Sequence, residues 1–216
     1  MNIYIKAGVL CGLLPFVAAC GGDTETVRPV PTIPPVAFPS SGLIGSGAWT
    51  TNDLISVIGA NDAFNQGVAD GRILVGVPST PTATYNGTIA FTAPTAQPKE
   101  FYGRMTMDVD FGASALSGHA TDFGLAKNTA SSGGPLSPLS GRLDFRRTTM
   151  TGPDFQTAME GTLGGVGGPY VIRSQLIGKV HTNADKSLVQ GIVTGDMSSD
   201  VIPVLPFSSG QFLATE

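Results

Sequence analysis

The chain has 216 residues, which is enough for one domain with its own core, and only 13% of them are charged. Its 16 acidic and 12 basic residues give a net charge of −4, which argues against nucleic acid as a partner. The two cysteines and two histidines do not occur at the spacing of a metal site.

Residues 1–19 have the pattern of a secretory signal peptide. Lys6 supplies a positive charge, residues 7–17 are apolar, and Val17-Ala18-Ala19 forms a small-residue cleavage site. The apolar stretch is too short to span a bilayer as a helix. Without Lys6, 11 basic residues remain against 16 acidic ones, so we expect a charge of −5 on the mature chain. Cys11 is removed with this segment, so we expect no disulfide.

The residue that follows the cleavage site is Cys20, and Val17-Ala18-Ala19-Cys20 resembles the lipobox of bacterial lipoproteins. That resemblance implies acylation of Cys20 and a stable lipid anchor in the membrane. The alternative is a secreted protein with a chance cysteine at this position. Gly21 resembles the second residue of lipoproteins sorted to the outer membrane. We therefore expect a lipid-anchored outer-membrane protein, displayed at the cell surface or on the periplasmic face.

The next two segments precede the regular part of the chain. Residues 20–41 hold the lipidated cysteine and a Pro-rich stretch, which predicts a semi-extended, disordered tether. Residues 42–78 alternate apolar clusters with glycines and predict an irregular lead-in. Within it, short strands and one short helix over residues 61–66 both fit the pattern.

From residue 79 to residue 216 the sequence predicts an all-β domain. Apolar and polar residues alternate with a period of two in eight segments that are separated by turn residues. The predicted strands are residues 84–92, 102–111, 115–123, 138–147, 154–163, 170–181, 187–197 and 210–215. Because the links are short, neighbours should pair antiparallel, which predicts an eight-stranded up-and-down β-barrel.

Glycines favour a barrel over a sandwich, because seven strands each place one in phase with the apolar face. Glycine there suits a sheet that bends tightly. These residues are Gly87, Gly103, Gly118, Gly141, Gly161, Gly178 and Gly191. The apolar face also carries bulky side chains that predict a filled interior: Phe91, Met105, Met107, Phe111, Phe145, Phe155, Met159 and Leu163. The opposite face is charged, which indicates a soluble barrel rather than one that spans the outer membrane.

Three segments of the barrel resemble the transferrin-binding protein B-like surface lipoproteins. They are residues 77–87 (VPSTPTATYNG), Asp108-Val109-Asp110-Phe111-Gly112 with Leu116-Ser117-Gly118, and residues 159–165 (MEGTLGG). The resemblance covers residues 76–216 and implies a non-enzymatic module that captures an extracellular protein or a carrier of metal or haem. Large members have two lobes with handle domains, for which this chain lacks room, so no partner-binding residue is transferred.

Other chemistry has weak support in the sequence. His119 and His181 fall on predicted outer faces, where solvated histidines are expected, and we expect no metal, cofactor or catalytic residue. Residues 164–168 (GGVGG) lack the Lys-Ser/Thr of a phosphate-binding loop and predict a hairpin turn. Asp108 and Asp110 share one strand face and are expected to meet arginines such as Arg104 or Arg142.

Binding is expected in the long loops, residues 124–137 and 198–209. The second is apolar between prolines, so it is either a partner contact or a flap packed over the barrel mouth. Its candidate contact residues are Val201, Ile202, Val204, Leu205 and Phe207. Two other functions stay open: a calycin-like carrier of a small apolar ligand or haem inside the barrel, and a structural envelope lipoprotein.

Overall fold

A computed structural model of the chain describes residues 49–95, 98–127, 136–183, 186–200 and 202–216. The expected signal peptide, Cys20 and the expected Pro-rich tether lie outside the described residues. The described residues form α1 (Thr51–Ala69), β1 (Leu74–Val75), β2 (Thr82–Ala93), β3 (Lys99–Asp110), β4 (Ala115–Lys127), β5 (Ser137–Thr151), β6 (Asp154–Gly164), β7 (Tyr170–Thr182), β8 (Ser187–Ser199) and β9 (Ile202–Thr215).

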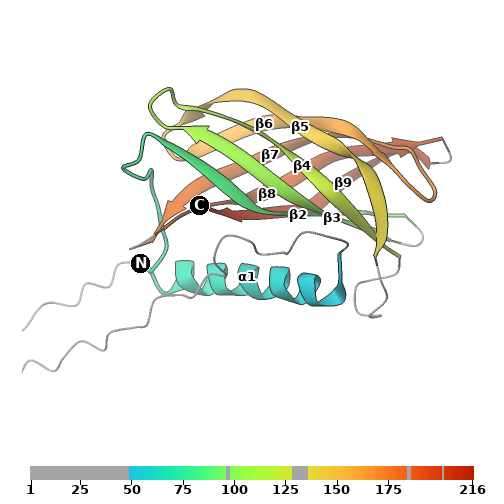
Figure 1. Cartoon of the computed structure of the whole chain (residues 1–216), viewed down its shortest axis with the longest axis horizontal. Coiled ribbons are helices and arrows are strands. Elements are labelled where there is room, and N and C mark those ends of the chain that lie inside the picture. The colour runs from blue at the N-terminus through green and yellow to red at the C-terminus, as the bar shows by residue number, and fades with distance from the viewer. Residues whose placement is uncertain (1–48, 96–97, 128–135, 184–185, 201) are drawn as a thin grey trace, which may run out of the picture. The chain divides into compact units, whose positions relative to one another are not determined.

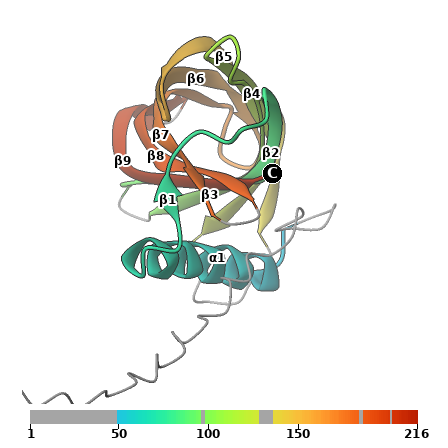
Figure 2. The same ribbon diagram turned by 90° about the vertical axis from the view of Figure 1, so that its left-hand side faces the viewer.

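Strands β2 to β9 close into a barrel (Figure 1). Each strand pairs antiparallel with the next along the chain, and residues 211–215 of β9 return to pair with residues 86–90 of β2. Figure 2 shows the resulting ring of strands end-on. The prediction of an eight-stranded antiparallel up-and-down barrel is therefore confirmed. Strands β2, β4, β6 and β8 finish at one end of the barrel, and β3, β5, β7 and β9 finish at the other, which we name the C-terminal end.

A 19-residue helix, α1, and the short strand β1 occupy much of the predicted irregular lead-in. The lead-in is therefore more regular than predicted, and the helix considered for residues 61–66 lies within the longer α1. Thr50 caps the helix: its hydroxyl accepts a hydrogen bond from the N–H of Asp53 at 3.2 Å, and the Asp53 carboxylate accepts one from the N–H of Thr50 at 2.7 Å. No helix in the described part of the chain combines the length and apolar character needed to cross a membrane.

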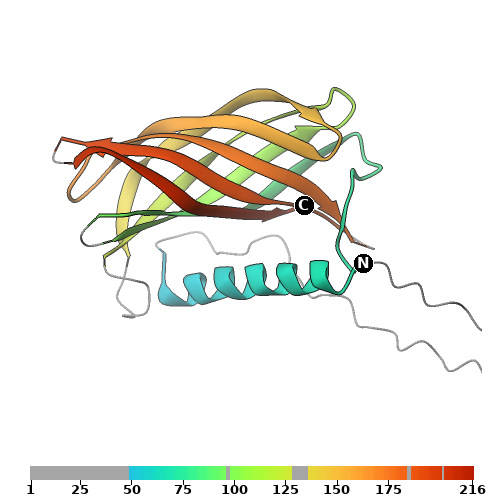
Figure 3. The same cartoon turned by 180° about the vertical axis from the view of Figure 1, so that it is seen from behind.

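The helix packs on the outer wall of the barrel through two apolar clusters. Leu54 and Val57 of its first half, with Trp49 just ahead of the helix, form a cluster with Tyr102, Ala126 and Leu136. Its second half contributes Ala60 and Phe64 to a cluster with Ile73, Leu188 and Leu213. The first cluster lies where β4 finishes, which we name the Trp49 end, and the second lies at the C-terminal end. Figure 3 shows α1 along the wall between them.

Strand β1 adds a short ninth strand outside the ring. Leu74 pairs with Thr182 and Val75 pairs with His181, while Asp154, the first residue of β6, pairs only as far as Lys179. β1 thus occupies the edge of β7 that β6 leaves open at the C-terminal end. The N–H of Gly76 continues this pairing by donating to the carbonyl of Val180 at 3.2 Å.

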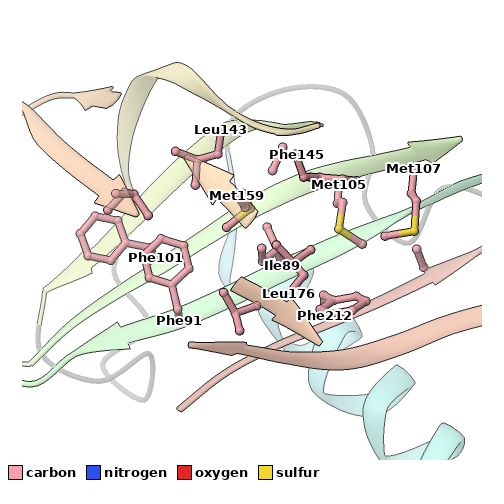
Figure 4. Close-up of a cluster of buried hydrophobic side chains, with 14 of the residues drawn as sticks. Ile89, Phe91, Phe101, Met105, Met107, Leu143, Phe145, Met159, Leu176 and Phe212 are labelled. Atoms are coloured by element: carbon pink, nitrogen blue, oxygen red, sulfur yellow. The ribbon is translucent and has the colours of Figure 1, made fainter. Parts of the chain in front are cut away.

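The barrel interior is filled with side chains, as predicted (Figure 4). The ring of Phe91 stacks on that of Phe101 at 5.0 Å and on that of Phe207 at 4.9 Å. Tyr170 meets Phe101 edge-on at 5.3 Å. The side chains that the sequence assigns to the interior are all buried apart from Phe111, which is partly buried against them. This core supplies most of the apolar burial that stabilises the fold.

The glycines act in more than one way. A Cβ on Gly103 would lie 2.5 Å from the ring of Phe123, so glycine leaves space for a large neighbour inside the barrel. Gly178 and Gly191 are also buried. Gly141 differs from the expectation because it is exposed: its φ of +107° turns β5, and a Cβ there would lie 2.2 Å from the carbonyl oxygen of Thr162.

Candidate interaction surfaces

The apolar segment of residues 198–209 is not a loop. β8 continues to Ser199, and β9 begins at Ile202 and pairs with it, for example Leu205 with Met197. Phe207 is buried and stacks inside the barrel on Phe91, and Leu205 is half-buried. Val204 is 66% exposed, whereas Val201 lies outside the described residues. Val204 is therefore the most exposed of the candidate contact residues whose side chains the structure describes.

Two prolines explain why this half of β9 was mistaken for a loop. Pro203 and Pro206 have no N–H to donate, which argues against a central strand. In the barrel, β9 pairs with β2 only from Gln211 onward, so the first half of β9 has one partner, β8. That half is an edge, where proline is tolerated, and the register of β8 and β9 also shifts between Met197 and Ser199.

The end of β4 also differs from the predicted loop of residues 124–137. β4 runs to Lys127 and β5 begins at Ser137, so strand pairing extends into this segment at both ends. Leu136 is buried in the first α1 cluster. Residues 128–135 lie outside the described residues. The glycine-rich segment of residues 164–168, in contrast, forms the predicted hairpin turn, with the N–H of Gly168 donating to the carbonyl of Gly165 at 3.1 Å.

The charged residues of the outer wall pair differently from the prediction. Asp108 accepts a hydrogen bond from the hydroxyl of Thr84 at 2.7 Å, and Asp110 lies 4.0 Å from Arg147. Arg104, an expected partner of Asp108 or Asp110, instead lies under the indole of Trp49, 5.4 Å from the ring centre, and 3.4 Å from Asp122. Arg142 instead bonds Asp144 of its own strand at 2.5 Å. These exposed pairs contribute little to stability.

The two histidines have different environments. His119 is half-buried on the wall, in register with Asp144. His181 was predicted to be solvated, but it is only 6% exposed, so that prediction is wrong. The helix covers its strand face, which alternation within β7 does not reveal. Among the described residues, no group of three or more His, Cys, Asp or Glu side chains is placed to hold a metal ion.

A hydrogen-bonded chain of polar side chains lies at the C-terminal end. The Tyr85 hydroxyl donates to Ser187 Oγ at 2.9 Å, and Ser187 Oγ donates to the Glu216 carboxylate at 2.5 Å. Burial raises the pKa of Tyr85 to about 12, because the phenolate would lose its hydration. Ser187 is 1% exposed, so its hydroxyl is shielded from solvent and serves to connect the other two groups.

A hollow of about 580 Å³ lies on the outer wall across β5 to β8. Ile177 and Ile192 form a cross-strand pair beside it and are 40% and 48% exposed. The next pair in register, Gly178 with Gly191, is buried and faces the barrel interior, and its backbone also borders the hollow. The remaining lining residues are Thr149, Thr151, Asp154, Phe155, Gln156, Lys179 and Gln190. We name this surface, with its two isoleucines, the isoleucine hollow.

A second hollow, of about 610 Å³, lies at the C-terminal end of the barrel. The segment between β1 and β2, the start of β8 and Glu216 line it. Its lining is mostly polar, including Ser79, Thr80, Asn183 and Lys186. Val77 also lines this hollow and is 44% exposed, so the isoleucine hollow differs in presenting a cross-strand pair of exposed aliphatic side chains rather than a single one.

Neither a protein-family model nor a curated protein matches this chain.

Proposed function

We propose that this protein is a lipid-anchored, non-enzymatic binding module of the bacterial outer membrane, and that it contacts a protein partner through the outside of its barrel. The lipobox-like Val17–Cys20 supports the anchor. The packed interior supports binding on the outside, because the stacked rings of Phe91, Phe101 and Phe207 occupy the space that an interior ligand would need. The same packing does not favour the interior carrier.

The resemblance to transferrin-binding protein B-like lipoproteins agrees with this function. A single barrel that follows a signal peptide and a Pro-rich stretch is the arrangement that the resemblance implies. Under this proposal the partner is an extracellular protein, including a carrier of metal or haem, rather than transferrin itself. A structural envelope lipoprotein has the same anchor but needs no partner, so binding is the property that distinguishes the two.

The isoleucine hollow is the contact surface that we assign to this function. Protein contacts form around exposed apolar side chains in a concave setting with a polar rim. Ile177 and Ile192 provide the apolar centre, and Gln156 and Gln190 provide uncharged hydrogen-bonding groups beside it. Lys179 and Asp154 at the edge form an ion pair with each other, so the rim carries no net charge.

Site-specific photo-crosslinking tests the surface. A photoreactive amino acid is placed at position 192 and, as a matched control, at position 204, where Val204 is at least as exposed. We expect crosslinks to another protein on living cells from position 192. Crosslinks from position 204 alone would contradict the isoleucine hollow and favour the contact predicted from sequence.

Protease treatment of intact cells tests the location. If the domain is displayed at the surface, protease removes it while a periplasmic control protein survives. The variant Cys20→Ala should lose its membrane attachment, because the anchor needs the thiol. Normal membrane fractionation of that variant would contradict the lipobox, and protection of the wild-type domain would contradict surface display.

A further inference from the structure

His181 is a buried histidine on the outer wall of the barrel, beside α1. It lies on the outward face of β7 and is only 6% exposed. Neither Nδ1 nor Nε2 finds a donor or acceptor among the described residues. The ring of Phe64, on α1, meets the imidazole edge-on with their centres 5.0 Å apart. An imidazole in this position is held as an apolar ring, which suits its neutral form.

Asp154 is an anion whose charge acts on His181, but it is already paired with Lys179. The α1 residues that pack at this end, Ala60 and Phe64, are apolar, as are Leu74 and Val75 of β1 and Leu188 of β8. Its own strand carries Lys179, which is paired with Asp154 of β6. Just before β1, Arg72 is paired with Asp70 at 2.5 Å. The ring itself takes part in no ion pair among the described residues.

We propose that protonation of His181 releases the second half of α1 from the barrel, which makes the helix a pH-sensitive cover. An imidazolium would bring two N–H donors and a positive charge into an apolar contact. Water reaches those donors only if Phe64 moves away, and Phe64 is part of the cluster that holds this half of the helix. The first half is held separately, by Trp49 and its cluster, so the helix opens from the C-terminal end.

The direction of the pH dependence follows from the burial. Burial lowers the pKa of His181 below its ordinary value of 6.5, and the charge of Lys179 lowers it further, against a smaller opposing effect of Asp154. In the open form the ring is solvated and regains the ordinary value. Above pH 6.5 the ring is neutral in both forms, so the helix stays docked. Below pH 6.5, His181 is protonated more readily in the open form, because its pKa is higher there than in the docked form. The ratio of open to docked helix therefore rises by up to about tenfold for each pH unit of acidification.

Opening would change the surface of the protein at one place. Leu188 and Leu213 are fully covered in the docked form, and the departure of Phe64 uncovers them. The barrel ring is unaffected, because its strands are paired without α1. Acidification therefore exposes Leu188 and Leu213 to solvent without unfolding the barrel.

Hydrogen exchange of the full chain purified from cells tests the proposal. Amide exchange is measured at pH 7.5, 6.5 and 5.5 and corrected for the intrinsic rate at each pH. We expect the protection of residues 60–69 to fall by up to about tenfold per unit below pH 6.5. The amides of β4 serve as the internal reference, because their protection reports on the barrel rather than on the helix.

Two variants make the test specific. His181→Phe keeps an aromatic ring but cannot be protonated, so its helix should stay protected at pH 5.5. His119→Gln removes the other histidine and should behave like the wild type. Equal loss of protection in His181→Phe and wild type, or no loss in the wild type, would overturn the proposal. If His181→Phe does not fold, His181→Gln provides the same comparison with a neutral polar side chain.

Discussion

The indole Nε1 of Trp49 donates a hydrogen bond to the backbone carbonyl of Asp122 at 2.5 Å, although the two residues are 73 positions apart. Asp122 adopts a φ of +50° where the register of β4 and β5 shifts, and this irregularity turns its carbonyl toward the helix. A bulge in the barrel wall thus provides the acceptor for the start of α1.

Trp49→Phe should lower the free energy of unfolding by about 1–3 kcal/mol, because it removes the donor and leaves the Asp122 carbonyl unpaired. Urea unfolding followed by circular dichroism measures the change. Ile55→Val is the control. Ile55 is 62% exposed, so the free energy of unfolding of this variant should stay within about 0.5 kcal/mol of the wild-type value. A Trp49→Phe protein as stable as the control would contradict the role of this bond.

Two glycine substitutions should have opposite effects. Gly103→Ala places a Cβ 2.5 Å from the Phe123 ring inside the barrel, and such overpacking costs about 1–3 kcal/mol. Gly59→Ala meets nothing within 4 Å on the exposed face of α1, and alanine there should stabilise the helix by about 0.5–1 kcal/mol. Calorimetric melting should place the two variants on opposite sides of the wild type. The reverse order would show that the barrel has room at Gly103.

Phe101→Ala should cost about 3–5 kcal/mol, since it leaves a cavity between the rings of Phe91 and Tyr170. Ile192→Ala removes an aliphatic side chain that is 48% exposed, so its effect on stability should be within about 0.5 kcal/mol. Guanidinium unfolding of both variants compares them directly. A small effect at Phe101 would mean that the interior is loosely filled, and the carrier function would then regain support.

Alkaline stability should depend on Tyr85. Its folded pKa is raised to about 12 from an ordinary value of 10.0, so the buried phenol stabilises the folded protein fully below pH 10. As pH rises from 10 toward 12, the unfolded chain ionises first, and this contribution is lost by up to about 1.4 kcal/mol per pH unit. Tyr85→Phe should show a shallower decline in stability between pH 9 and about 11.5, measured by urea unfolding at each pH. If the free energy of unfolding declined with pH equally in the wild type and in Tyr85→Phe, the pKa of Tyr85 would not be raised by folding, which would contradict the prediction.

Strand alternation located the barrel well, because each strand has one face in the core and one face in water. β3 is the clearest case, with Phe101, Met105 and Met107 inward and Asp108 outward. The period-two pattern survives wherever nothing covers the wall. For that reason each of the eight predicted strands overlaps one of β2 to β9. The largest difference is at β9, which begins at Ile202 rather than at residue 210.

Other features depend on contacts that a single segment does not encode. The apolar periodicity of α1 is hard to recognise because Ile55 and Ile58 are apolar but lie on its exposed side. Thr50 and Asp53, in contrast, form a capping box that the sequence pattern can indicate. His181 alternates as an outward residue and becomes buried only because α1 and β1 cover it. The isoleucine hollow needs Ile177 opposite Ile192, a register that only the paired strands reveal.

The path of α1 along the wall has a mechanical consequence. The chain reaches the barrel at the Trp49 end, travels the length of the helix, and begins β2 at the C-terminal end. A force on the chain ahead of Trp49 therefore acts on the contacts of Trp49 and α1 before it reaches β2. The helix therefore lies between the barrel strands and any force that is applied to the preceding chain.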